Sequence, residues 1–199
     1  MSNERWEKAR RYSHIGMHSN NNYVYASQYA TAFEILYKSD TPVDVIALPL
    51  LYNLRHYVEL MLKYNIQYLH DFSGSKRVLG KVNHKLMPLL DLFEDYWKLV
   101  KLRYGIQVND IDLMSDLEKL IKKIDEIDEN AMSFRYSHDR KDAKLFEWQD
   151  KIDVYELYNL YERAKVMLNH TIDVFDDSTG LMGNSVTKEQ LLDYPIPKI

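Results

Sequence analysis

Apolar residues recur every three or four positions along most of the chain, the spacing that gathers them on one face of an α-helix. Ala26, Phe33 and Leu36 follow this spacing in the first stretch, and Leu117, Ile121 and Ile124 in a later one. We therefore predict helices over residues 20–39, 41–69, 83–103, 110–132 and 153–175. Long helices that each carry one apolar face favour an all-α fold, an antiparallel helical bundle of about five helices.

Polar and glycine residues mark where these helices begin and end. Thr41 and Asp153 are expected to cap the second and fifth helices, and Gly105 to end the third. We expect one helical domain over residues 1–177, with a basic segment at 1–18 and a loop at 133–150. Residues 178–199, which end in Tyr-Pro-Ile-Pro-Lys-Ile, are expected to form an extended tail.

Composition narrows the chemistry. The 199 residues contain no cysteine, which excludes disulfides and thiolate sites, and 26 basic against 30 acidic residues give a net charge of −4. This slightly acidic balance argues against nucleic-acid binding by the whole surface, although local basic patches remain. No apolar run is long enough for a membrane span and no secretory segment stands at the start, so we expect a cytoplasmic protein without membrane contact.

No metal or cofactor site is predicted. His14 and His18 have the spacing of two metal ligands on one helical face, but no third ligand stands nearby. The Gly74 to Lys81 region lacks both the glycine spacing and the hydroxyl residue of a phosphate-binding loop.

The second predicted helix carries a concentration of ionisable groups. At about 100° per residue, its polar side chains fall within one arc of about 100°, at the border of the apolar stripe. They are Tyr52, Arg55, His56, Glu59, Lys63 and His70. Two interpretations stay open: a ladder of ordinary ion pairs along the helix, or a site whose pKa values are shifted by partial burial.

Three segments carry a family resemblance. They are Arg-His-x-x-Glu-x-x-x-Lys at 55–63, Asn-His-Lys-Leu at 83–86 and Phe-Arg-Tyr at 134–136. Together they resemble HEPN-like helical proteins of prokaryotes, over roughly residues 45–137. The resemblance implies a helical bundle, often dimeric, in toxin–antitoxin, abortive-infection or other anti-phage systems, where active members are metal-independent ribonucleases.

The catalytic signature of that family is an arginine followed by a histidine, with four to six residues between them. Arg163 and His170 match it with six intervening residues, and they fall on one face of the fifth helix. Ala164 stands where the family usually has a polar residue, and Arg11/His18 and Arg77/His84 share the spacing. A catalytic pair and an ordinary helix surface or dimer contact therefore both remain open.

A second candidate site joins several helices. If the second, third and fourth helices are neighbours, their polar groups would converge around Glu59; these are Arg55, His56, Lys63, His84, Arg135 and Tyr136. Such a surplus of donors suits an anionic ligand, a phosphate or nucleotide. The alternative is a salt-bridge network that fixes the register of the bundle.

We expect an HEPN-like protein of a defence or toxin–antitoxin type system that binds RNA or another phosphate-bearing ligand. In the catalytic form of this hypothesis it cleaves RNA without a metal, with His170 or His56 transferring the proton. Arg163, or Arg55 together with Arg135, would then stabilise the phosphate. The alternative function is a non-catalytic helical adaptor for a protein partner of the same system, and a homodimer is expected in either case.

Overall fold

The computed structural model describes residues 21–77, 84–128, 131–138, 141–147 and 149–181. In this part of the chain all regular structure is helical, apart from one isolated bridge between His138 and Lys144. The helices are α2 (Asn22–Tyr37), α3 (Val43–Ser73), α4 (Leu86–Tyr104), α5 (Ile111–Asp128) and α6 (Val154–Thr179). The predicted all-α bundle is confirmed, whereas the basic segment 1–18 and the tail from 182 onward lie outside the described residues.

Local chemistry explains most of the helix ends. The Asp153 side chain accepts a hydrogen bond from the Glu156 N–H (2.8 Å), so its predicted capping role is confirmed. Gly105 ends α4 in the left-handed conformation (φ 67°), also as predicted. Thr41 does not cap α3: Pro42 occupies the cap position and no side chain bonds there, so the prediction for Thr41 was wrong.

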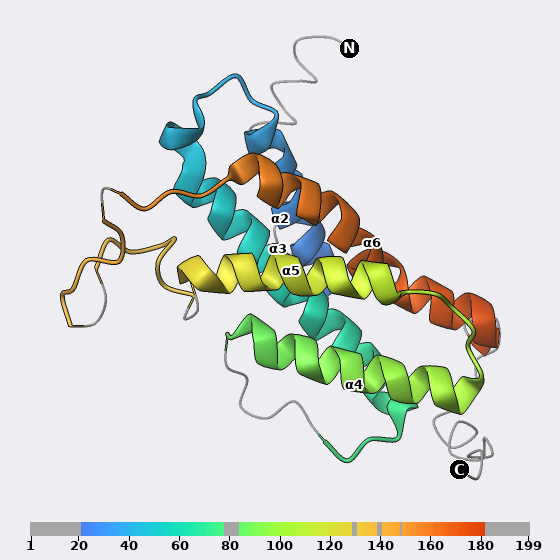
Figure 1. Cartoon of the computed structure of the whole chain (residues 1–199). Coiled ribbons are helices and arrows are strands. Elements are labelled where there is room, and N and C mark those ends of the chain that lie inside the picture. Colours follow the sequence, from blue (N-terminus) through green and yellow to red (C-terminus); the bar gives the residue numbers. More distant parts are fainter. Residues whose placement is uncertain (1–20, 78–83, 129–130, 139–140, 148, 182–199) are drawn as a thin grey trace, which may run out of the picture.

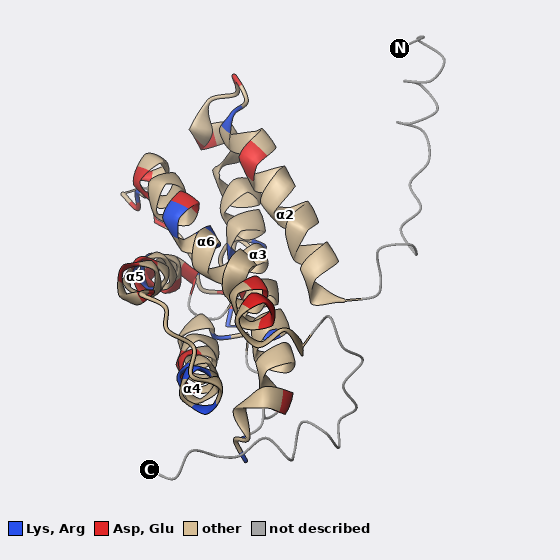
Figure 2. Ribbon diagram, turned by 90° about the vertical axis from the view of Figure 1, so that its right-hand side faces the viewer, with Lys and Arg blue, Asp and Glu red and all other residues tan. Residues whose placement is uncertain are grey.

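Helix α3 lies in the middle of the bundle. Helices α2, α4 and α6 lie around it, and α5 lies on the side away from α2 (Figures 1 and 2). Helices α2 and α6 also contact each other, through the stacked rings of Tyr37 and Tyr158 (3.8 Å between centroids). The interior is filled by apolar side chains from all five helices, among them Phe33, Leu54, Phe93, Ile121 and Phe175. Polar side chains are buried there as well; among them, Asn65 of α3 donates to the Leu168 carbonyl of α6 (2.8 Å).

Successive helices differ in relative direction. The pairs α2/α3, α4/α5 and α5/α6 are antiparallel, as expected (Figure 1). Helices α3 and α4 run the same way, because Arg55 in the first half of α3 contacts His84 just before α4, while Phe72 and Tyr104 meet at the far ends (6.4 Å between ring centroids). The twelve connecting residues, 74–85, can span about 40 Å, which makes this arrangement possible. It brings the start of α4 beside the middle of α3.

Helix α5 ends at Asp128, four residues before the predicted end. The Asp128 carboxylate accepts hydrogen bonds from the N–H groups of Met132 (2.6 Å) and Ser133 (2.7 Å), which turns the chain away from the helix axis. The following segment then covers the core with Phe134, whose ring stacks on Phe146 (6.3 Å between centroids). The described residues of 133–150 contain no helix, and Phe134 lines a cavity together with Leu48 and Leu51 of α3.

Candidate functional site

The polar groups of α3 are more deeply buried than their position at the border of the apolar stripe suggested. Arg55 is 3% exposed and Glu59 is 2% exposed. Both belong to a set of charged side chains, Arg55, Glu59, Asp128 and Lys63, that we call the inner network. Charged groups this deep in a protein need partners for every donor and acceptor, because an unpaired buried charge costs several kcal/mol.

Arg55 meets this requirement with all three of its guanidinium nitrogens. Its Nη1 donates to Glu59 Oε2 (2.9 Å), and its Nη2 donates to the His84 carbonyl oxygen (2.5 Å). Its Nε lies 3.3 Å from the Asp128 carbonyl oxygen and 3.4 Å from Asp128 Oδ2. Arg55 therefore ties α3 to the end of α5 and to the start of α4, and each of its three nitrogens is already bonded within the protein.

Asp128 is the member of this network that the sequence reasoning missed. It stands four positions after Ile124 and seven after Ile121, so it continues the buried apolar stripe of α5. An acidic residue at a stripe position was the available signal, because such a residue must find a buried cation or N–H donors. Asp128 finds both, in Arg55 and in the turn at Met132 and Ser133.

The Glu59 carboxylate accepts hydrogen bonds from three side chains, which are cationic groups or an imidazole. Its Oε1 lies 2.6 Å from Lys63 Nζ and 2.8 Å from His84 Nδ1, and its Oε2 takes the bond from Arg55. Burial alone would raise the pKa of Glu59, but the hydrogen bonds from Lys63 and His84 outweigh it and hold this pKa below its ordinary value. Glu59 is therefore a carboxylate at neutral pH, and it orients the His84 ring.

A small recess opens above this network. We call it the α3 recess; it is lined by Tyr52, Arg55, His56, Glu59, His84, Ala131 and Arg135. Its volume of about 50 Å³ has room for a few water molecules. The α3 recess thus unites the Arg-His-x-x-Glu helix, the start of α4 and the Phe-Arg-Tyr segment, as the convergence hypothesis requires. The more exposed of these side chains lie at its mouth.

Three side chains form that mouth, and they differ from the inner network in exposure. The His84 side chain is 67% exposed, and because Nδ1 faces Glu59, its Nε2 points away from the network. The exposed Arg135 donates from Nε to the Ala131 carbonyl (2.9 Å), and its guanidinium lies over the Tyr136 ring (5.5 Å). His56 packs edge-on against Tyr29 (4.3 Å between centroids).

The surroundings of His56 keep its ring neutral. Burial lowers the pKa of His56, and the positive charges of Lys63, Arg55 and Arg135 add to the lowering, while Glu59 opposes it. A neutral imidazole can accept a proton. Across the whole site, three cations (Arg55, Lys63, Arg135) face two carboxylates, Glu59 and Asp128, so the balance is one net positive charge when both histidines are neutral.

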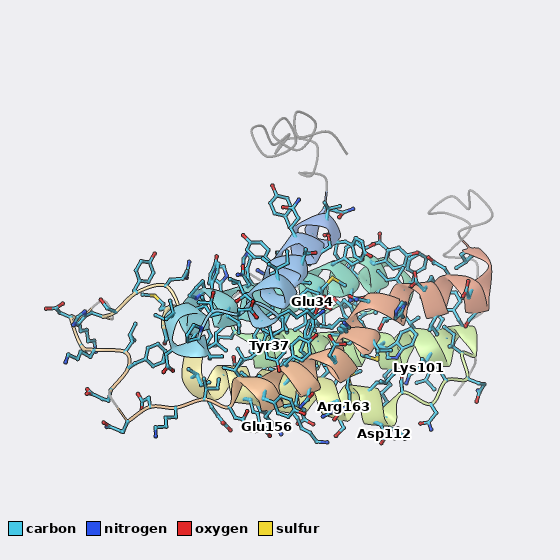
Figure 3. The ribbon with its side chains drawn as sticks, turned by 90° about the horizontal axis from the view of Figure 1, so that it is seen from above. Glu34, Tyr37, Lys101, Asp112, Glu156 and Arg163 are labelled. Atoms are coloured by element: carbon cyan, nitrogen blue, oxygen red, sulfur yellow. The ribbon has the colours of Figure 1, made fainter. Side chains whose placement is uncertain are left out.

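The remaining predicted site residues lie elsewhere. Lys63 joins the cluster through Glu59 and does not line the α3 recess, and Tyr136 is exposed beneath Arg135. Arg163 and His170 lie on α6, and Figure 3 labels Arg163 there. Arg163 Nε bonds Asp116 Oδ2 of α5 (2.8 Å) and His170 Nδ1 bonds Asp173 Oδ2 (2.9 Å). Each is more than half exposed and each has its own carboxylate partner, so no described contact links the two.

Among the described residues, no group of three or more His, Asp or Glu side chains is arranged to hold a metal ion. In the same part of the chain, no helix combines the length and the apolar character that crossing a membrane requires. Comparisons of the chain with protein-family models, with curated proteins and with solved structures found no match.

Proposed function

We propose that the protein is an HEPN-like member of a prokaryotic or phage-related defence or toxin–antitoxin system, and that it binds RNA or another phosphate-bearing ligand at the α3 recess. The observation that carries the proposal is the meeting of Arg135, His56 and His84, from three separate segments, around one opening. The proposal places the protein in the cytoplasm as a homodimer, with a protein partner from the same system.

The donors at the mouth support a phosphate rather than an apolar ligand. A guanidinium can donate to a phosphate oxygen, and so can His84 Nε2 when the ring is protonated on both nitrogens, since Nδ1–H already donates to Glu59; charge-assisted bonds of this kind are the stronger ones. The inner network supports them from below: Arg55 holds the His84 backbone and Glu59 holds its ring. Arg55 therefore acts as a positioning residue in this proposal, and Arg135 takes the contact with the phosphate.

The same groups fit metal-independent cleavage of RNA. His56, neutral at pH 7, would take the proton of a 2′-hydroxyl as its oxygen attacks the adjacent phosphorus. The bond from phosphorus to the 5′-oxygen breaks, and protonated His84 gives that leaving oxygen a proton from Nε2. Arg135 would stabilise the charge that develops on the phosphate oxygens. The alternative catalytic pair, Arg163 and His170, has no comparable support, because its two side chains are separately paired on an open helix surface.

The second candidate function is a non-catalytic helical adaptor that binds a protein partner. The observation in its favour is the completeness of the inner network, in which Arg55 and Glu59 are buried and fully bonded. Such a network can fix the register of a bundle without binding anything.

Cleavage of total RNA by the purified full chain, with and without EDTA, separates these functions. The proposal predicts EDTA-insensitive cleavage that His56→Ala and His84→Ala each reduce by about 10²–10⁴-fold. His170→Ala is the matched control and should retain activity. Loss of cleavage in H170A alone would move the site to α6. Intact RNA in every sample, together with no binding of RNA, would favour the adaptor.

A further inference from the structure

We propose that a second cavity, directly beside the α3 recess, is a subsite for a nucleobase. The inference rests on the proposed function, because it assigns the second half of the same ligand. The cavity has a volume of about 410 Å³, and its walls include Asn22 of α2, Lys63 and Gln67 of α3, and Tyr96 of α4. A volume of this size falls within the usual range of small-molecule sites, about 300–1,000 Å³.

The two cavities share the wall between Glu59 and Lys63. Glu59 lines the α3 recess, Lys63 lines the second cavity, and their side chains are joined by a 2.6 Å hydrogen bond. Gln67 follows Lys63 by four residues, about 6 Å along α3. A ligand whose phosphate sits at the mouth of the α3 recess would therefore extend its next chemical group along α3 into this cavity.

Two amide side chains supply the recognition chemistry. Asn22 and Gln67 both line the cavity, and within the described part of the chain neither side-chain amide has a hydrogen-bond partner in the protein. An amide offers a donor and an acceptor side by side, and that pair matches the donor and acceptor edge of a heterocyclic base. Two such amides from different helices at one cavity favour a planar polar ligand over a purely apolar one.

Ring surfaces and an apolar side chain complete the walls. The rings of His70 and Tyr96 lie 5.8 Å apart at a tilt of 52°, and Ile66 forms part of the wall beside them. Tyr96 is fully buried, whereas the His70 side chain is 39% exposed, so a single-stranded base would stack on the His70 ring, with Tyr96 behind it.

The charges of the cavity favour a neutral group there rather than a second phosphate. Lys63 is neutralised by Glu59, and His70 Nδ1 lies 3.2 Å from Asp71 Oδ1. Each basic group in this cavity thus has a carboxylate partner, whereas Arg135 at the α3 recess contacts a carbonyl oxygen and an aromatic ring. The geometry therefore divides the ligand into a phosphate at the α3 recess and a base at the second cavity.

Fluorescence anisotropy with two labelled oligomers tests this division: a mixed-sequence single-stranded RNA, and an abasic ribose–phosphate oligomer of the same length. We expect the wild-type chain to bind the RNA at least about fivefold more tightly than the abasic oligomer. In the double variant N22L/Q67L, the RNA affinity should fall toward that of the abasic oligomer, whose own affinity should not change. Gln28→Leu, an exposed amide on α2, is the matched control.

Equal affinities of the wild-type chain for the two oligomers would overturn the base subsite while leaving the phosphate site intact. An equal loss for both oligomers in N22L/Q67L, at an unchanged midpoint of urea unfolding, would overturn it as well. If the wild-type chain binds neither oligomer, the proposed function itself fails, and the base subsite fails with it. If the double variant has a lowered unfolding midpoint, its affinities are set aside. The base subsite is then judged only from the affinities of the wild-type chain for the two oligomers.

Discussion

The inner network and the mouth of the α3 recess are built from similar residues, yet they differ in how many groups they leave for a ligand. Arg55 is buried and all its nitrogens are bonded within the protein, whereas Arg135 is exposed and contacts a carbonyl and a ring. Glu59 is buried as well, while His84, which it orients, is largely exposed. The same type of charged side chain is thus bonded within the fold when it is buried and is open to solvent when it lies at the mouth.

This difference separates two kinds of experimental effect. A change in the inner network should lower the free energy of unfolding, because it leaves buried charges without partners. A change at the mouth should lower binding or activity at nearly constant stability, because its side chains are solvated with or without a ligand.

Arg55→Met should destabilise the fold by about 3–5 kcal/mol, since it leaves Glu59 and Asp128 buried without their shared cation. Urea unfolding followed by circular dichroism measures the change. Arg163→Met is the matched control: it removes an exposed ion pair with Asp116 and should cost less than about 1 kcal/mol. Equal costs for the two variants would show that burial does not distinguish these arginines.

Glu59→Gln should lower stability at pH 7 by about 1–3 kcal/mol, because Arg55 and Lys63 lose their common carboxylate. The folded-state pKa of Glu59 lies below its ordinary value of 4.5, so the contribution of its charge is present above that pH and is lost as the pH falls through the folded pKa.

The stability gap between the wild type and E59Q should therefore narrow as the pH is lowered below about 4.5. Unfolding midpoints measured between pH 7 and pH 3 test this narrowing. A gap that widens on acidification would contradict the assignment of Glu59 as the buried carboxylate.

His56 should give a smaller, pH-dependent effect. Its folded-state pKa lies below its ordinary value of 6.5, so the unfolded chain takes up this proton more readily, and the wild type should lose stability as the pH falls below 6.5. H56Q cannot take up that proton and should lose less stability over the same range. Proton NMR titration of the His56 ring gives the pKa directly, and a value above 6.5 would contradict the lowering.

His170→Ala should have the smallest effect, within about 0.5 kcal/mol in stability, because this histidine is exposed and bonds only Asp173 among the described residues. RNA affinity measured by anisotropy should also be unchanged. A large loss of affinity in this variant alone would show that α6, and not the α3 recess, binds the ligand.

Much of the fold followed from the sequence, because long apolar stripes and few glycines leave little choice except helices. The predicted convergence at the α3 recess also agrees with the structure, since His84 and Arg135 both reach the recess beside Arg55. Asp128 was missed because an acidic residue at the end of an apolar stripe looks like the polar face of a longer helix. Its bonds to Met132 and Ser133 also explain why α5 ends early; these partners lie beyond the helix, so the apolar spacing of α5 alone does not predict its last residue.

The burial of Arg55 could not be predicted from the spacing of residues along the helix either. Periodicity gives the direction of a side chain around its helix, but its burial depends on which helices cover it. Arg55 is covered by the end of α5 and by the start of α4. The start of α4 lies there because α3 and α4 run parallel. Arg55 therefore changed from a candidate ligand contact to a positioning residue.

The most direct test of the account is the affinity of Arg135→Met for single-stranded RNA, measured by anisotropy at low salt beside its unfolding midpoint. The account predicts a loss of roughly tenfold in affinity, the size of one charge-assisted bond, at an unchanged midpoint. Lys144→Met, an exposed cation of the same loop, should change neither value. Wild-type affinity in R135M, or an equal loss in both variants, would contradict a phosphate site at the α3 recess.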